Sequence, residues 1–153
     1  MKHLTRTLAF ASLAALAAPS WAQFAKSEDA IKYRQGALFV MQQNFARVAA
    51  MAAGRAAFDG KLAAESAATA EYLARLPWAA FGDGTDKGRE TRAKPEIWQD
   101  KARFNDYAEK MQMQMEMAKL SAATKAGTLD AIKPAVASVG NSCKTCHDAF
   151  RKD

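Results

Sequence analysis

The sequence has 153 residues, a quarter of them charged, and its formal net charge is +6 at pH 7. This length is that of a single domain. The basic residues are scattered among acidic ones, with no basic block and no binding motif, so the composition argues against a nucleic-acid-binding protein.

Residues 1–22 have the pattern of a secretory signal peptide. A basic start with Lys2 and Arg6 precedes a short apolar run, and a small-residue cleavage pattern ends at Ala22. The apolar run is too short to span a bilayer, and no later stretch is longer. We therefore expect cleavage after Ala22, export to the periplasm, no membrane anchor after processing, and a mature domain of residues 23–153.

The mature region is rich in Ala, Lys, Glu, Gln and Met, which favour helices. The first helix is predicted over about 27–53, with Ser27 as N-cap and Gly54 as its end. Arg34 is the one charged member of its apolar seam, and a buried guanidinium requires an anionic partner. The seam, at alternating steps of three and four residues, is Ile31, Arg34, Leu38, Met41, Phe45, Val48 and Ala52.

The second helix is predicted over about 59–76 and ends before Pro77. A glycine-rich, charged loop over 82–94 follows and is expected to be exposed. The third helix is predicted from Pro95 to about 125. The inward residues expected on the second helix are Leu62, Thr69, Leu73 and Leu76, and those on the third are Ile97, Phe104, Ala108, Met111, Met115 and Ala118.

The fourth helix is predicted to end near Lys152 and to begin at either Thr128 or Pro134, because an internal proline would kink it. Its seam is Ile132, Val136, Val139, Cys143, Cys146 and Phe150. Four amphipathic helices with mostly short connections predict an all-α, antiparallel up-down-up-down four-helix bundle.

The motif Cys143-Lys-Thr-Cys146-His147 on the fourth helix is the candidate functional site of the sequence. Two thiols three residues apart project to one side of a helix, a spacing that suits thioether bonds to two vinyl groups on one porphyrin edge. His147 follows directly and is placed to bind the iron. We therefore predict one covalent haem c with His147 as axial ligand. A disulfide oxidoreductase would normally have a βαβ setting, and zinc would need more ligands than these three.

The second axial position of the iron is the open question. The sequence has two histidines, and His3 leaves with the signal peptide, which excludes a bis-histidine haem. If no methionine binds, the iron is five-coordinate and open to small gases. Each mature methionine is more often core filler than ligand, and these are Met41, Met51, Met111, Met113, Met115 and Met117.

Several segments resemble the cytochrome c′ family: residues 23–35, the stretch Leu-Pro-Trp-Ala-Ala-Phe-Gly over 76–82, Pro95-Glu-Ile-Trp98, and the terminal haem motif through 151. The resemblance covers essentially the whole mature chain. It implies a four-helix bundle, a homodimer and a high-spin, five-coordinate haem. It also implies that Leu38, at the position of the family's bulky distal residue, covers the open face of the iron. Met41, one turn on, leaves a low-spin Met-ligated electron-transfer cytochrome as the alternative.

The resemblance implies further site residues. Arg34 and Gln35 match residues that meet the haem propionates, Trp78 and Phe81 match pocket walls, and Arg151 matches a basic residue on the proximal side. The plainer alternatives are a surface ion pair for Arg34, core packing for the two aromatics and a solvated charge for Arg151.

The sequence departs from the family pattern in its loop before Pro95, which looks longer and more charged, and in its run of four methionines from Met111 to Met117. Thioethers favour Cu(I), so a copper-handling role is an alternative to helix packing or a dimer surface.

The function expected is that of a haem protein that binds nitric oxide and carbon monoxide. A ligand would have to displace Leu38, and nitric oxide binds ferrous haem strongly enough to do so. The alternative is an electron carrier that uses the exposed haem edge, outer basic residues and an unknown redox partner. We do not expect an enzyme, because peroxidase-like turnover would lack a distal histidine for acid–base work.

Overall fold

The computed structural model describes residues 24–110 and 113–152. Within these ranges the chain is helical, and its one extended pairing is an isolated bridge between Ala93 and Arg151. None of the described helices is long and apolar enough to cross a membrane. The predicted signal peptide lies outside the described residues. The elements in order are α1 (Ser27–Ala52), α2 (Gly60–Leu73), the 3-10 helix η1 (Trp78–Phe81), α3 (Glu96–Gln99), α4 (Lys101–Asn105), the π-helical η2 (Asp106–Lys110), α5 (Met113–Thr124) and α6 (Leu129–Phe150).

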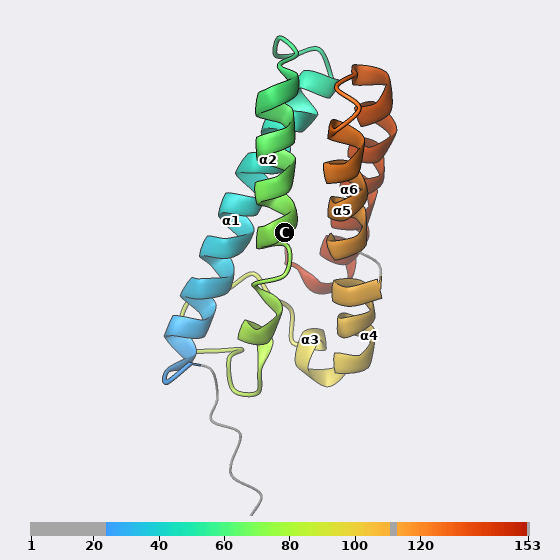
Figure 1. The fold of residues 1–153 in the computed structure, drawn as a ribbon. Helices are drawn as coiled ribbons and strands as arrows, with labels where there is room; N and C mark the ends of the chain where they lie inside the picture. The colour runs from blue at the N-terminus through green and yellow to red at the C-terminus, as the bar shows by residue number, and fades with distance from the viewer. Residues whose placement is uncertain (1–23, 111–112, 153) are drawn as a thin grey trace, which may run out of the picture.

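The long helices alternate in direction, as Figure 1 shows. The chain rises through α1, descends through α2 and η1, rises again through α3, α4, η2 and α5, and descends through α6. Helix α1 packs on α2, α2 on α5, α5 on α6, and α6 back on α1. The up-down-up-down bundle is therefore confirmed, with one of its four limbs divided into several short pieces.

The predicted seams of α1 and α6 are confirmed. Their buried members are Ile31, Arg34, Met41 and Val48 on α1 and Ile132, Val139 and Phe150 on α6. The remaining seam residues are partly buried. Thr128 caps α6 by accepting a hydrogen bond from the Ala131 amide at 3.4 Å, so the helix begins at Leu129 and continues through Pro134.

The inward face predicted for α2 is wrong in part. Leu62 is 40% exposed and Thr69 is exposed, whereas Leu73 packs partly against the core. The residues that α2 buries are small: Ala63, Ser66, Ala67 and Ala70. Side chains of this size let α2 lie close to both α1 and α5, so the leucine spacing did not identify the face that packs.

The third predicted helix is interrupted. The helix is interrupted at Asp100, whose carboxylate caps α4 by accepting a hydrogen bond from the Arg103 amide at 3.0 Å. Ile97, Phe104 and Ala108 are buried as predicted, and Met111 lies outside the described residues. On α5 the prediction of Met115 as inward is wrong, because Met115 is 50% exposed. Ala118 is partly buried. The residues that α5 buries are Met117, Leu120, Ser121 and Thr124.

Two hydrophobic groups fill the interior. The bundle core lies among the long helices and consists of Met41, Val48, Met51, Ala63, Ala67, Ala70, Ala74, Met117, Leu120, Ile132 and Val139. The aromatic cluster is centred on Ile97, Phe104 and Phe150, with Trp78, Phe81, Trp98 and Tyr107 around it. Trp78 packs against both groups, so it joins them.

Candidate haem attachment site

The last turns of α6 carry the predicted haem motif. Helical periodicity places Cys143, Cys146 and His147 within an arc of roughly 100° on α6. Cys143 packs against the bundle core and Cys146 against the aromatic cluster, whereas His147 is exposed. The two thiols therefore face the interior where the two hydrophobic groups meet, and the imidazole lies at its edge.

Both thiols lie in surroundings that favour an uncharged sulfur. Burial raises the pKa of Cys143. Burial, followed by the nearby Cys143, raises the pKa of Cys146 to about 11. Thiolates are the reactive and metal-binding form of cysteine, and this site disfavours them. In the part of the chain that the structure describes, no three His, Cys, Asp or Glu side chains are grouped to hold a metal ion. The surroundings suit a neutral thioether better than a zinc or redox-active thiol site.

His147 is held in the form that can donate a lone pair to a metal. Burial, then the positive charges of Arg151 and Arg92, lower its pKa, while Asp148 has the opposite effect. The neutral imidazole is thereby favoured. Arg151 lies one helical turn on, with its Nη1 3.4 Å from His147 Nδ1. The structure thus places Arg151 beside the predicted axial ligand.

Leu38 reaches the same interior from α1, which packs against α6. It is partly buried and packs against the bundle core, as Cys143 and Trp78 do. Met41, one turn further along α1, is a buried member of that core. Trp78 donates from its indole to the Ala74 carbonyl oxygen at 2.6 Å, and this bond fixes its ring.

Phe81 extends this wall into the aromatic cluster. Its ring lies 6.3 Å from that of Trp78 in a stacked arrangement and 4.9 Å from that of Phe104. The predicted pocket residues Leu38, Trp78 and Phe81 therefore line one continuous apolar region with the two cysteines.

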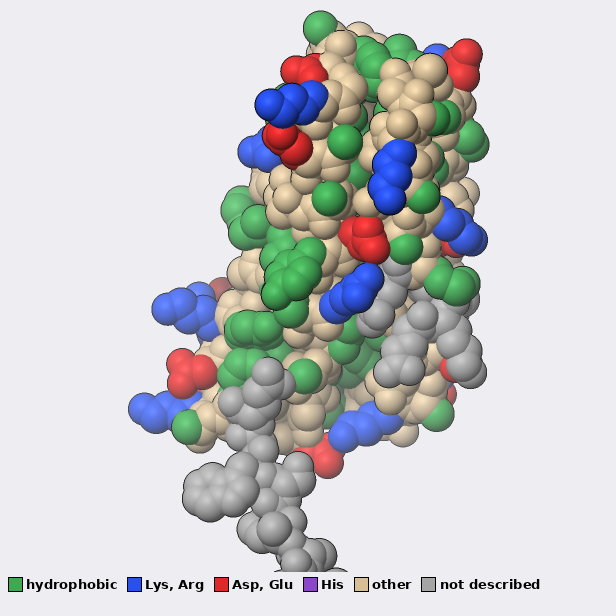
Figure 2. Space-filling view, in the orientation of Figure 1, with side chains coloured by type: hydrophobic (Ala, Val, Ile, Leu, Met, Phe, Trp, Pro, Cys, Tyr) green, Lys and Arg blue, Asp and Glu red, His purple; other side chains and the backbone are tan. Residues whose placement is uncertain are grey.

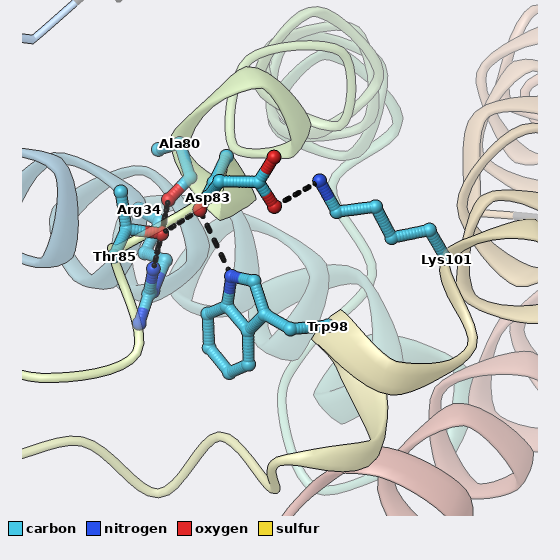
Figure 3. A network of polar contacts seen from close by, with 7 residues as sticks. Arg34, Ala80, Asp83, Thr85, Trp98 and Lys101 are labelled. Carbon is cyan, nitrogen blue, oxygen red and sulfur yellow. Dashed lines mark hydrogen bonds and ion pairs between the residues drawn. The ribbon is translucent and has the colours of Figure 1, made fainter.

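Arg34 lies at the centre of a polar network that sequence reasoning did not foresee (Figure 3). The side chain is 2% exposed. Its Nη1 donates to the Ala80 carbonyl oxygen at 2.7 Å and to Thr85 Oγ1 at 3.1 Å, and its Nη2 donates to Thr91 Oγ1 at 3.3 Å. These are neutral acceptors, and no ion pair joins Arg34 to a carboxylate of the described residues, so the alternative of a surface ion pair with a helix neighbour is not the arrangement seen. Contact of Arg34 and Gln35 with haem propionates stays a prediction.

Aromatic faces complete the surroundings of this guanidinium. Its carbon lies 4.5 Å from the centroid of Phe81 and 5.4 Å from that of Trp98, within the range of cation–π attraction. Burial lowers the pKa of Arg34 to about 10, and the charge of Asp86 opposes this shift. The side chain is therefore still charged at neutral pH.

Most of the loop after η1 is exposed, as predicted, but a few of its residues make bonds to the bundle and to the helices that follow. Trp98 donates from its indole to the Gly82 carbonyl oxygen at 2.9 Å, and Lys101 pairs with Asp83 at 2.6 Å (Figure 3). Thr85 and Thr91 are partly buried against Arg34. A glycine-rich composition predicts a loop, but it contains no periodic signal that says where the loop packs.

Residues 89–94, here called the strap, fix the end of α6. The Lys94 amide donates to the Phe150 carbonyl at 2.9 Å, and the Lys152 amide donates to the Arg92 carbonyl at 2.7 Å. On the other side of the strap, Gln35 donates to the Glu90 carbonyl at 2.9 Å and accepts from Arg89 Nε at 3.3 Å. Gln35 is thus an exposed residue of α1 that binds the strap, and its neighbour Arg34 is buried.

Comparison with known proteins agrees with this geometry. The Cytochrome C' family model matches residues 29–151. A cytochrome c' from Rubrivivax gelatinosus is 49% identical over 130 residues, which cover 85% of this chain and 99% of that protein. Its crystal structure superposes with a TM-score of 0.80 over 85% of this chain and all of the other.

A second solved structure is the nitric oxide complex of a variant of cytochrome c prime from Alcaligenes xylosoxidans. It is 44% identical, covers 86% of this chain and 99% of its own, and gives a TM-score of 0.77. The residues matched by the family model, 29–151, include the haem motif, the apolar walls and the strap. The chain therefore belongs to the cytochrome c′ family.

Proposed function

We propose that the mature chain carries one haem c, bonded through Cys143 and Cys146, with His147 as axial ligand to a five-coordinate, high-spin iron. Family membership implies a covalently bound c-type haem. The two inward thiols, the neutral imidazole and the apolar walls fit such a group. We propose further that the protein is periplasmic and binds nitric oxide and carbon monoxide.

The observation that carries this proposal is the position of Leu38. It reaches from α1 into the bundle core against which Cys143 packs from α6. Its side chain has no donor atom and cannot hydrogen-bond a ligand. When bound, the haem supplies an iron that can take a diatomic ligand. Leu38 excludes water from that face, and moving a half-buried leucine costs about 1 kcal/mol. A strong ligand such as nitric oxide should offset this cost, and the solved nitric oxide complexes of variants of the relative support binding of this gas within the family.

The neighbouring alternatives have less support. Met41 packs as a buried core residue with Val48 and Met51, which is the usual role of a methionine. In the methionine run, Met117 is 1% exposed and Met115 is 50% exposed, so these two side chains do not converge on one copper ion. Outside the predicted signal peptide, His147 is the only histidine of the sequence, so a peroxidase-like enzyme would have no second imidazole for proton transfer.

The test is an optical and spin-state spectrum of the purified ferric and ferrous protein, with and without nitric oxide. We expect a high-spin, five-coordinate spectrum that changes on addition of nitric oxide. The variant Leu38→Ala should bind carbon monoxide faster, and Met41→Leu should leave the spectrum unchanged. A colourless protein would overturn haem attachment. A low-spin spectrum that Met41→Leu converts to high-spin would establish the methionine-ligated alternative.

We also propose a homodimer, formed through α1 and α2. Large hydrophobic side chains lie exposed there, as Figure 2 shows along that side of the molecule. Phe39 is 63% exposed and Tyr72 is 67% exposed, with Val40 and Leu62 also exposed. Such a patch is typical of an interaction surface. We expect Phe39→Glu to give a monomer in sedimentation equilibrium, whereas Lys125→Glu at the end of α5 should leave a dimer. A monomeric wild type would contradict this proposal.

A further inference from the structure

Positive charge gathers around the exposed imidazole of His147. The strap and the end of α6 enclose a hollow of about 300 Å³, lined by Arg92, Lys94, His147, Asp148, Arg151 and Lys152. Four of these six side chains are cationic. The one acidic side chain, Asp148, has its carboxylate bound by Lys144 at 2.5 Å.

Three of the four cations of this basic hollow make contacts with neutral groups. Arg92 Nε donates to the Lys152 carbonyl oxygen at 3.2 Å, and Lys94 Nζ donates to the Asp148 carbonyl oxygen at 2.9 Å. Arg151 contacts the His147 ring. Among residues 24–110 and 113–152, no ion pair involves these four cations. Their charge is therefore not neutralised by the described carboxylates, and three of the four side chains, those of Arg92, Lys94 and Arg151, are held by polar contacts.

Ion pairing alone does not distinguish these four cations. Lys61, Arg75, Lys101 and Lys119 each lie within 4.0 Å of a carboxylate. Other exposed cations, such as Lys32 and Lys125, have no ion pair among the described residues either. What sets the basic hollow apart is that four cations line one hollow next to the predicted axial ligand.

The lining also indicates the size and kind of the occupant. Small-molecule sites are mostly apolar with a few polar groups, whereas this hollow is lined by charged side chains. Its volume admits protruding side chains of another protein. Clustered cations of this kind speed the approach of an acidic partner and orient it.

We propose that the basic hollow is the docking surface for an acidic electron-donor protein, which would insert carboxylate side chains among Arg92, Lys94, Arg151 and Lys152. The inference rests on the proposed attachment of haem with His147 as ligand. A partner docked here lies against His147, which provides a short path to the iron. The step is the transfer of one electron from the donor's reduced centre to ferric iron, and no bond forms or breaks.

The experiment uses the haem-loaded protein and two small oxidants of opposite charge, because a surface that steers anionic electron donors also steers anionic acceptors. The ferrous protein is oxidised by ferricyanide or by tris(phenanthroline)cobalt(III) in a stopped-flow instrument at low and high salt. The variants are Lys152→Glu, which reverses a charge without removing a described side-chain hydrogen bond, and Lys94→Gln, which removes a charge. Lys125→Glu, at the end of α5, is the matched control.

We expect Lys152→Glu to slow oxidation by ferricyanide at least about threefold at low salt and to speed oxidation by the cobalt complex. Lys94→Gln should act in the same direction, and Lys125→Glu should have a smaller effect on both oxidants. High salt should remove the differences. Poly-glutamate should inhibit ferricyanide oxidation of the wild type more strongly than that of Lys152→Glu.

Equal effects of Lys152→Glu and Lys125→Glu would overturn the proposal, because net charge alone would then explain the rates. A shift in midpoint potential or Soret band without a change in salt dependence would also overturn it, since the cations would then be acting on the haem itself. A colourless protein would instead show that the proposed function fails. Circular dichroism of each variant establishes that the fold is retained.

Discussion

The upper half of the bundle in Figure 1 is held together differently from the lower half. In the upper half, long helices pack through alanine and methionine in the bundle core, and their surface ion pairs, such as Lys61–Glu65 and Glu71–Arg75, join neighbours in one helix. In the lower half, short helices and a loop surround the aromatic cluster. Here the polar bonds of Arg34 join residues 46 to 57 positions apart.

The difference follows from what each backbone can satisfy by itself. A long helix pairs its own amide and carbonyl groups, and it needs only an apolar face for packing. Short helices and loops leave carbonyl groups that must find other partners. Side chains supply these partners. Arg34 donates a hydrogen bond to the carbonyl oxygen of Ala80, Trp98 donates to that of Gly82, and Lys94 donates to that of Asp148 at the end of α6. The candidate haem site lies where these two kinds of construction meet, so its walls depend on side-chain bonds as well as on helix packing.

The largest effect that separates the two halves is expected for Arg34→Ala. The change removes three buried or partly buried hydrogen bonds, those to the Ala80 carbonyl oxygen and to the hydroxyls of Thr85 and Thr91, and opens a cavity between Phe81 and Trp98. We expect a loss of about 3–4 kcal/mol in the free energy of unfolding, measured with urea.

The matched control for this change is Arg47→Ala, on the same helix. Arg47 is exposed, and its Nη1 donates to Asn44 Oδ1 at 3.1 Å. We expect a cost of at most about 0.5 kcal/mol. If both arginine variants lost the same stability, the lower half would not depend on the buried guanidinium.

A smaller effect is expected for Gly88→Ala in the loop. Gly88 has φ +103°, and a Cβ there would lie 2.5 Å from Ser27 Oγ and 2.9 Å from Glu28 Oε1 at the start of α1. We expect a cost of about 2 kcal/mol in thermal or urea unfolding. Gly84→Ala is the control, because φ is +76° there but the added Cβ meets open space, and it should cost about 1 kcal/mol. Equal costs would show that the loop is not held against α1 at Gly88.

The same division explains which features could be predicted from the sequence. The seams of α1 and α6 follow from helical spacing, and the C-x-x-C-H motif predicts haem attachment by its own chemistry. Leu62 was predicted to be buried because it is large and apolar. The face of α2 that packs against the bundle is instead the one with its alanines, which allow the helices to lie closer together, and Leu62 is exposed. Small side chains carry little periodic signal, so this face could not be recognised.

The lower half could not be predicted in the same way. The oddity of Arg34 on an apolar seam was a correct signal of a buried charge, but its partners Thr85 and Thr91 come from a loop without periodicity. The strap and the basic hollow depend on backbone bonds between residues about 60 positions apart, which no local pattern encodes. The break at Asp100 had a local signal, because aspartate is one of the residues preferred at the N-cap of a helix.

The smallest expected effect on stability concerns Glu116, which forms an ion pair with Lys119 within α5 and a hydrogen bond with Ser138 of α6. Its Oε1 lies 2.6 Å from Lys119 Nζ, and its Oε2 accepts a hydrogen bond from Ser138 Oγ at 2.6 Å. The hydrogen bond from Lys119, and next that from Ser138, lower the pKa of this carboxyl. The unfolded chain therefore binds a proton at a higher pH than the folded one. The resulting stabilisation is complete above the unfolded pKa and is lost as the pH falls through the folded pKa.

Glu116→Gln should therefore lose less stability than the wild type on acidification from about pH 6 to pH 3, by at most about 1 kcal/mol because the pair is at the surface. Urea unfolding across this range measures the difference, and Glu65→Gln provides a control, since Glu65 lies 3.9 Å from an almost fully exposed Lys61. The side-chain bonds of Glu116 are to Lys119 and Ser138 and not to the haem motif at the end of α6, so the variant should leave the spectrum of the bound haem unchanged. A spectral change with Glu116→Gln would mean that the two halves are coupled through α6, and the division between scaffold and site would have to be redrawn.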